Sequence, residues 1–367
     1  MRRCRLHFLV ALRGIKFCLA LADSAEKRAN FRGLDKGKRD KSRITDEGLM
    51  MRNLNTPNFN LGNRRMDLAL KNALIERGQS YKSVATNHVH IKRFTSYLIK
   101  EHGIRQLAKI EHGHVAAYAE YLVERYEQGD ISPSTAQNAL SAINSAMSQA
   151  RQDDVCRVTG KEAGLPGRTF VATKDKSVDD EKHMAIKAKV SERLASQLDL
   201  QRSLGLRFKE SCLINANNIL KQAESHGTVR IMDGTKGGRR REVPITSPNQ
   251  MEALKVAAQI QGEDKSMIPP SMTFKDYREA AYNEIRGKMA GFHGERHTYA
   301  NDRYEKLAGV QSPVRAGIKH GTAHHQYIAE QLSISLSEAK SLDHRIRLKI
   351  SNELGHGRID VTNSYLG

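Results

Sequence analysis

Residues 353–367 read ELGHGRIDVTNSYLG, with His356 nine positions before Tyr365. A single tyrosine near the end of a chain has no diagnostic value. Here, however, Arg207 follows a Gly-Leu pair, and residues 293–296 read HGER, which places a histidine and an arginine three positions apart. Such side chains can act together on a phosphate, because cations hold its oxygens while a hydroxyl attacks it. The pattern therefore predicts a fold that gathers these distant segments around Tyr365.

The length and charge of the chain narrow its possible classes. A chain of 367 residues favours two domains and a tail over a single core. The net charge of +19 and the isoelectric point near 9.8 favour a polyanionic partner. Charge alone leaves open a basic ribosomal-type protein or an ordinary soluble one. Tryptophan is absent and aromatic residues make up only 5% of the chain, which disfavours an aromatic stacking platform.

Cysteine, histidine and hydropathy patterns argue against several kinds of site. The four cysteines stand far apart without a Cys-x-x-Cys pair, which disfavours a zinc site and fits free thiols in a reducing cytoplasm. The fifteen histidines are scattered without companion ligands at metal spacing. No apolar run approaches the roughly 20 residues that cross a bilayer. We therefore expect no metal site and no membrane contact.

The first 50 residues are set apart from the fold prediction. Residues 1–25 imitate a signal peptide, but Arg13 and Lys16 interrupt the apolar stretch. We interpret residues 1–50 as a basic leader that is disordered, or that is not translated if synthesis starts at Met50 or at the next residue.

Residues 63–152 predict a small four-helix bundle. Apolar residues recur at helical spacing in each of its four segments. Ser80 can cap the second helix, and Ser132 followed by proline is typical of a helix start. Residues 153–177 are rich in glycine and lack periodicity, so we expect a flexible linker there.

Residues 178–367 predict a second domain, mainly helical with one small sheet. Helices are expected over residues 181–204 and 209–223. Residues 228–231 and 242–245 alternate on either side of a glycine-rich turn, which predicts a hairpin. After the hairpin the pattern is helical to the end of the chain. The fold class is therefore mainly α with a small β-sheet, in an α+β second domain.

Together the motifs resemble the catalytic signature of tyrosine recombinases, the phage integrase family, and most closely integrases of mobile elements. Gly-Leu-Arg at Arg207, His-x-x-Arg at His293 and Arg296, Leu-Gly-His at His356 and the terminal Tyr365 occur in the order found in that family. The resemblance spans residues 63–367. It implies a SAM-like core-binding domain over the four predicted helices and a catalytic domain after the linker.

The resemblance also implies a role for each residue of the signature. Tyr365 would attack phosphorus and form a 3′-phosphotyrosyl link, while Arg207 and Arg296 hold the non-bridging oxygens. His293 and His356 would donate hydrogen bonds or assist proton transfer. Lys236, in the hairpin turn, would be the general acid to the leaving 5′ oxygen, although a solvated turn lysine is a serious alternative.

Further cations are candidate DNA contacts. A solvated helix face explains the three on the second predicted helix equally well, whereas the arginine run beside Lys236 makes phosphate contact near that turn more plausible. The candidates are Lys82, Lys92, Arg93, Arg239, Arg240 and Arg241.

Three features depart from the family pattern. Glu295 stands where the family has leucine, which puts the packing of that helix in doubt. Arg296 and His356 are 60 positions apart, which suggests an insertion near residues 305–345 that could contact DNA or another protomer. Only two residues follow Tyr365 in this chain. What restrains or activates Tyr365 is therefore expected elsewhere, first in that insertion.

The predicted function is site-specific recombination of DNA. The resemblance implies a cytoplasmic, nucleoid-associated enzyme of a prokaryote that needs neither metal nor ATP nor another cofactor. Its expected partners are double-stranded DNA, three further copies in a homotetramer on paired sites, and accessory DNA-bending or directionality proteins. A type IB topoisomerase-like enzyme and a catalytically inactive DNA-binding descendant remain alternatives.

Overall fold

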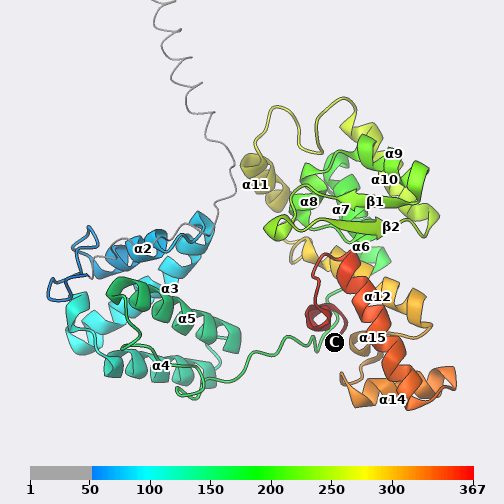
Figure 1. The fold of residues 1–367 in the computed structure, drawn as a ribbon. Helices are drawn as coiled ribbons and strands as arrows, with labels where there is room; N and C mark the ends of the chain where they lie inside the picture. The colour runs from blue at the N-terminus through cyan, green and yellow to red at the C-terminus, as the bar shows by residue number, and fades with distance from the viewer. Residues whose placement is uncertain (1–51) are drawn as a thin grey trace, which may run out of the picture. The chain divides into compact units, whose positions relative to one another are not determined.

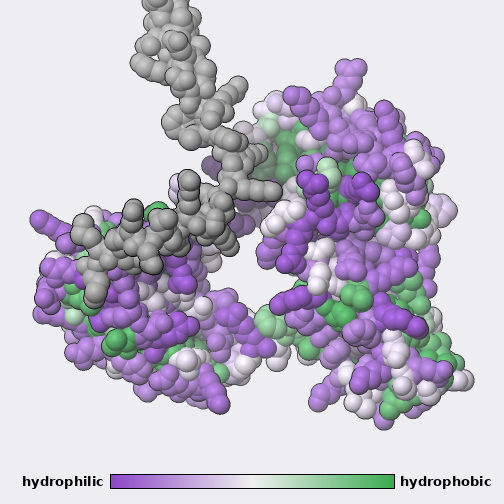
Figure 2. All heavy atoms as spheres, viewed as in Figure 1, coloured by the Kyte–Doolittle hydropathy of each residue, from purple (hydrophilic) through white to green (hydrophobic). Residues whose placement is uncertain are grey.

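The computed structural model describes residues 52–367, and the chain divides into two compact units between Pro166 and Gly167 (Figure 1). The predicted leader, residues 1–50, lies outside the described residues. Over the described range, no helix combines the length and apolar character that a bilayer span requires. On the face drawn in Figure 2, hydrophilic residues dominate the surface of both units.

The N-terminal unit contains the four predicted helices. They are α2 (Met66–Glu76), α3 (Tyr81–His102), α4 (His112–Glu127) and α5 (Pro133–Arg151), with the short 3-10 helix η1 (Leu107–Lys109) between α3 and α4. The hydroxyl of Ser80 accepts a hydrogen bond from the Ser83 amide at 3.2 Å, and Ser132 caps α5 in the same way at 3.2 Å. These local caps explain why the helix starts were predictable.

The first half of the predicted linker packs on this bundle. Cys156, Val158 and Leu165 join its buried core, and the Asn144 side-chain amide donates to the Val158 carbonyl at 2.7 Å. These three buried side chains anchor residues 156–165 to the bundle, which a flexible linker would not do. The unit therefore extends beyond its last helix to Pro166.

The C-terminal unit opens with four short helices where two long ones were predicted. They are α6 (Asp180–Lys187), α7 (Glu192–Leu204), α8 (Phe208–Leu213) and α9 (Ala216–His226). The Asp179 carboxylate caps α6, and the Asn215 side chain accepts from the Asn218 amide at 2.9 Å to start α9. Asn215 lies inside the second predicted helix, where its capping side chain competes with the backbone of a continuous helix and so divides it.

The sheet of the described chain is one antiparallel hairpin. Strand β1 (Thr228–Ile231) pairs with β2 (Arg241–Pro244), and Val229 lies opposite Val243. The second strand starts one residue earlier than predicted. Val229, Ile231 and Val243 face the core, and the turn between the strands contains the 3-10 helix η2 (Lys236–Gly238).

Helices follow the hairpin to the end of the chain, so the predicted fold class, mainly helical with a small sheet, is confirmed. They are α10 (Pro248–Gln261), α11 (Phe274–Glu284), α12 (His293–Ala308), α13 (Pro313–Ala316), α14 (Thr322–Leu332), α15 (Leu336–Glu353), η3 (Ile359–Thr362) and α16 (Asn363–Leu366). Helix α12 packs against α7, α15 and α16. The start of α12 and the end of the chain are thereby brought together (Figure 1).

Candidate active site

Arg207 is held at the start of α8 by Glu210. The Glu210 carboxylate accepts from the Arg207 backbone amide at 2.7 Å and from its guanidinium at 2.8 Å. The preceding Gly205 has φ 61°, and a Cβ there would lie 2.6 Å from the ring of Tyr299. The glycine of Gly-Leu-Arg is therefore required both by its left-handed backbone and by the close approach of that ring. The Arg207 side chain keeps 21% exposure, so a ligand can reach it.

The same carboxylate binds a second arginine from β2. Both guanidinium nitrogens of Arg241 donate to Glu210, at 2.8 and 2.7 Å. Burial alone would raise the pKa of Glu210, but the hydrogen bonds and charge of Arg241 outweigh it and lower the pKa to about 2. Arg241, expected from its sequence to contact DNA, is 2% exposed and is a partner of Glu210 instead. Sequence analysis missed this pairing because the Arg239–Arg241 run resembles a solvated turn.

Arg296 lies in the first turn of α12 and is fully buried. Its guanidinium donates to the backbone carbonyls of Gly205 and Leu354. Burial lowers the pKa of Arg296 to about 10, so the group remains charged at neutral pH. Its Nε donates to the hydroxyl oxygen of Tyr365 at 3.2 Å.

The Tyr365 hydroxyl is surrounded by the other signature residues. It lies 3.2 Å from Nε2 of His293 and 3.2 Å from Nε2 of His356. The side-chain amide of Asn301 on α12 donates to the Tyr365 carbonyl at 3.3 Å, which fixes the backbone of α16. Three other signature residues, His293, Arg296 and His356, therefore meet at the hydroxyl oxygen of Tyr365.

The histidines beside Tyr365 are neutral at neutral pH. Burial, and then the charge of Arg296, lower the pKa of His293 to about 4 and that of His356 to about 3. The ring of His297 lies 4.7 Å from that of Tyr365. Burial lowers the pKa of His297 to about 4 as well. An uncharged imidazole has one nitrogen free to accept a proton, so the phenol is next to potential proton acceptors.

Tyr365 covers the buried arginine. Its side chain is 4% exposed, and the Arg296 guanidinium carbon lies 5.8 Å from the centre of its ring. Since Arg296 has no exposed surface, a phosphate can contact both Arg207 and Arg296 only after the phenol shifts. In this conformation Tyr365 therefore blocks access to Arg296, whereas Arg207 remains accessible.

The structure does not bring Lys236 into this cluster. Lys236 is exposed in the hairpin turn, and no hydrogen bond or ion pair of residues 52–367 includes it. Its neighbour Arg239 donates to the His356 carbonyl at 2.6 Å, while Arg240 is exposed. The turn thus borders the site through Arg239. The other predicted DNA contacts, Lys82, Lys92 and Arg93, are exposed on α3 of the N-terminal unit.

Glu295 is accommodated by a buried ionic network. Its carboxylate lies 3.0 Å from Nδ1 of His183 and 2.9 Å from a guanidinium nitrogen of Arg202. A buried carboxylate is costly unless it is paired, and these two partners from α6 and α7 pair it. The departure from leucine therefore leaves α12 packed, with Glu295 pointing away from the neighbouring Arg296.

Asn363, the first residue of the helix α16 that carries Tyr365, makes hydrogen bonds to two other parts of the chain. Its carbonyl accepts from the Ala172 amide at 2.8 Å, and its side-chain oxygen accepts from Arg347 of α15 at 2.9 Å. Helix α13, within the suspected insertion, also packs against α16, so that region does reach the segment that carries Tyr365. Residues 167–178 lie on the other side, a contact that the sequence did not predict.

No group of three or more His, Cys, Asp or Glu side chains in the described part of the chain is arranged to hold a metal ion. The arrangement is instead a set of cations and neutral imidazoles around one phenol. Its chemistry is suited to a phosphate ester, because arginine binds phosphate oxygens through two parallel hydrogen bonds.

Comparisons with known proteins found solved structures that are similar to this chain. A Tn1549 transposon integrase in complex with transposon right end DNA has 12% identity and a TM-score of 0.46, over 82% of this chain and 95% of that one. A lambda integrase tetramer bound to a Holliday junction has 15% identity and a TM-score of 0.46, over 70% and 74%. A XerH site-specific recombinase has 17% identity and a TM-score of 0.43, over 78% and 84%. No curated protein sequence matches the chain.

The family model described as an integrase matches residues 164–302. This segment contains Arg207, His293 and Arg296. Over these residues the match bears out the resemblance to integrases that the motifs predicted.

Proposed function

We propose that the chain is a site-specific DNA recombinase that cleaves and rejoins DNA through a 3′-phosphotyrosyl intermediate. One observation carries the proposal: the Tyr365 hydroxyl lies 3.2 Å from Nε of Arg296, Nε2 of His293 and Nε2 of His356. A phenol that only filled space would not need a guanidinium and two imidazoles at its oxygen.

In the first step the Tyr365 oxygen forms a bond to phosphorus, and the bond from phosphorus to the 5′ oxygen breaks. The phenolic proton passes to Nε2 of His293 or His356, each of which is neutral at neutral pH. Arg207 and Arg296 stabilise the negative charge that builds on the non-bridging oxygens. Glu210 keeps the Arg207 guanidinium oriented.

The departing 5′ oxygen needs a proton. We assign this role to Lys236, because an exposed lysine on a glycine-rich turn can move onto a bound strand. In the second step a 5′ hydroxyl attacks the phosphotyrosyl bond and releases Tyr365. Since the bond energy is kept in the covalent link, rejoining needs no ATP. Exchange between two duplexes by a homotetramer, with accessory DNA-bending or directionality proteins, is part of the same proposal.

A nicked suicide duplex that carries the recognition site tests the chemistry. Cleavage releases a short strand from such a duplex, so a covalent protein–DNA adduct accumulates. We expect the adduct with the native chain and none with Tyr365→Phe. An adduct retained by that variant would refute the assigned nucleophile. Strand exchange between two duplexes, without relaxation of supercoils as the sole product, separates a recombinase from a topoisomerase-like enzyme.

A further inference from the structure

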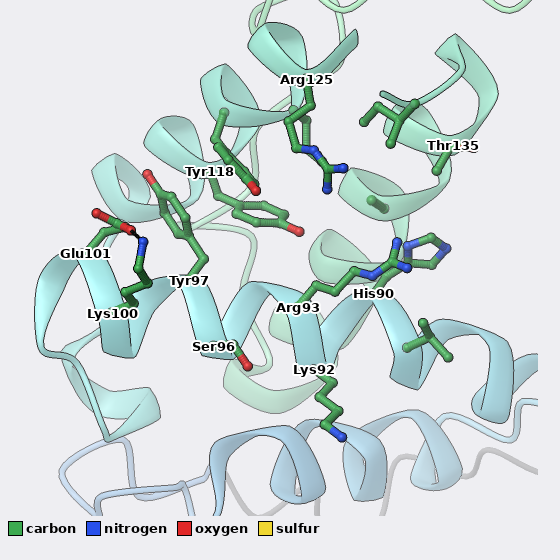
Figure 3. Close-up of a pocket in the computed structure, with 15 residues that line it drawn as sticks. His90, Lys92, Arg93, Ser96, Tyr97, Lys100, Glu101, Tyr118, Arg125 and Thr135 are labelled. Atoms are coloured by element: carbon green, nitrogen blue, oxygen red, sulfur yellow. Dashed lines mark hydrogen bonds and ion pairs between the residues drawn. The ribbon is translucent and has the colours of Figure 1, made fainter. Parts of the chain in front are cut away.

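The N-terminal unit contains a pocket that the proposed reaction does not use. It is a cavity of about 530 Å³ between α3, α4 and the beginning of α5, and Figure 3 shows the side chains around it. Volumes of about 300–1,000 Å³ are typical of sites for small molecules. All of its lining residues belong to one unit, so the pocket exists without the catalytic unit.

Three polar groups at this pocket have no protein partner among the described residues. Nδ1 of His90 is buried and makes no hydrogen bond. In Figure 3 a dashed line joins Lys100 to Glu101, whereas none reaches the guanidinium of Arg93 or the hydroxyl of Tyr118. A buried polar atom without a partner is costly, so Nδ1 of His90 favours a ligand that supplies a hydrogen bond.

The charge of the pocket favours an anion. Four of its lining residues are Lys or Arg and one is Glu. That carboxylate, Glu101, is engaged by Lys100 at 2.7 Å, and Arg125 pairs with Asp130, outside the lining, at 3.2 Å. Lys92 and Arg93 therefore face no acid of the lining. Burial raises the pKa of Tyr118 to about 12, so its hydroxyl remains a neutral donor at neutral pH.

The same pocket presents a cluster of aromatic rings. Tyr97 and Tyr121 are stacked with centroids 5.1 Å apart, and Tyr118 meets Tyr97 edge-on at 5.1 Å. The low aromatic content of the chain disfavoured a stacking platform, but the fold gathers three of its eleven tyrosines here. Aromatic side chains beside cations bind nucleobases whatever the sequence, because each base has a flat face.

We propose that this pocket binds a nucleotide, with the base against the Tyr97, Tyr118 and Tyr121 cluster and the phosphate at Arg93. The Tyr118 hydroxyl lines the same pocket and can share the phosphate oxygens. The nucleotide is either a free mononucleotide or one residue of a DNA strand turned out of its stack. The site goes beyond the proposed recombination and requires no cleavage at Tyr365.

Binding to the full chain can be measured by calorimetry with two probes, deoxyadenosine monophosphate and a short single-stranded oligodeoxynucleotide. We expect Arg93→Ala to weaken binding by about tenfold to a hundredfold, since a hydrogen bond to a charged group is lost. Tyr118→Phe removes only an unpartnered hydroxyl and should weaken binding several-fold with an unchanged fold. Lys109→Ala is the matched control, because Lys109 is exposed on η1 of the same unit and does not line the pocket.

The two probes identify the source of the nucleotide. Saturable binding of the mononucleotide that Arg93→Ala weakens supports a free nucleotide as ligand. Binding of the oligonucleotide alone, with the same sensitivity, supports a nucleotide within a strand. Binding of neither probe, or equal losses in Arg93→Ala and Lys109→Ala, overturns the proposal. The covalent-adduct assay at Tyr365 is independent, so failure of the recombinase assignment would be seen separately.

Discussion

The substitution Glu210→Gln tests how the arginines of the site are held. Glu210 has no exposed surface, and it binds Arg207 and Arg241 through four hydrogen bonds of 2.7 to 2.8 Å. Glutamine has nearly the same shape but no charge. It would leave the buried guanidinium of Arg241 without a counter-ion, which typically costs several kcal/mol.

The pKa of Glu210 gives the magnitude. It falls from 4.5 to about 2 on folding, and each unit corresponds to about 1.4 kcal/mol, so the carboxylate contributes about 3 kcal/mol at neutral pH. Because the folded pKa is the lower one, this stability is present above pH 4.5 and is lost as the pH falls towards 2. For a unit of this size, about 3 kcal/mol lowers the Tm by about 10 °C.

Differential scanning calorimetry of the full chain measures the effect on the C-terminal unit. Glu242→Gln is the matched control, because Glu242 also pairs with an arginine, at 2.8 Å, but both partners are exposed. An exposed pair contributes ~1 kcal/mol or less, so that variant should unfold close to the native temperature. Equal shifts in the two variants would refute the reasoning. A stability difference between Glu210→Gln and the native chain that stays constant between pH 5 and pH 2 would refute it too.

Three further predictions concern the reaction and its pH dependence. Arg296→Ala should lower the cleavage rate at least about a hundredfold, while duplex affinity measured by mobility shift remains close to native; equal loss of binding would make Arg296 a general DNA contact. Lys236→Ala should leave the Tm unchanged and should slow the cleavage of normal DNA. Cleavage of DNA in which sulfur replaces the leaving 5′ oxygen should not slow, because sulfur departs without a proton from an acid. Slow cleavage of both substrates would exclude the acid role. In the native chain the free energy of unfolding should fall between pH 7 and pH 5, because unfolded His356 takes up a proton near pH 6.5 and folded His356, with a pKa of about 3, does not. His356→Gln should make this fall smaller by up to about 2 kcal/mol, as measured by urea titration at each pH. An unchanged pH dependence would contradict this.

Local signals made the helical bundle predictable. The caps at Ser80 and Ser132 act within three residues of themselves, so the sequence alone contains them. The same reasoning overlooked the break at Asn215, since an asparagine inside an apolar pattern is compatible with a helix or with a cap. Apolar residues 156, 158 and 165 were too few to show periodicity, although they pack on the core.

The environment of the signature residues was not predictable in the same way. Glu210 and Arg241 are 31 positions apart, and His183 and Glu295 are 112 apart. Charged side chains are mostly exposed in proteins, and no periodic pattern indicates which of them are buried in pairs. The signature identified the residues around Tyr365, whereas the buried partners of these residues became evident only in three dimensions.

Mass spectrometry of the trapped adduct tests the central claim most directly. Trypsin cleaves after Arg358, so the end of the chain is released as residues 359–367, whose one tyrosine is Tyr365. After nuclease digestion of the suicide-substrate complex, we predict a 3′-linked nucleotide on this peptide, located at Tyr365 by fragmentation. A nucleotide attached to any other residue, or no covalent nucleotide on a cognate site, would contradict the account.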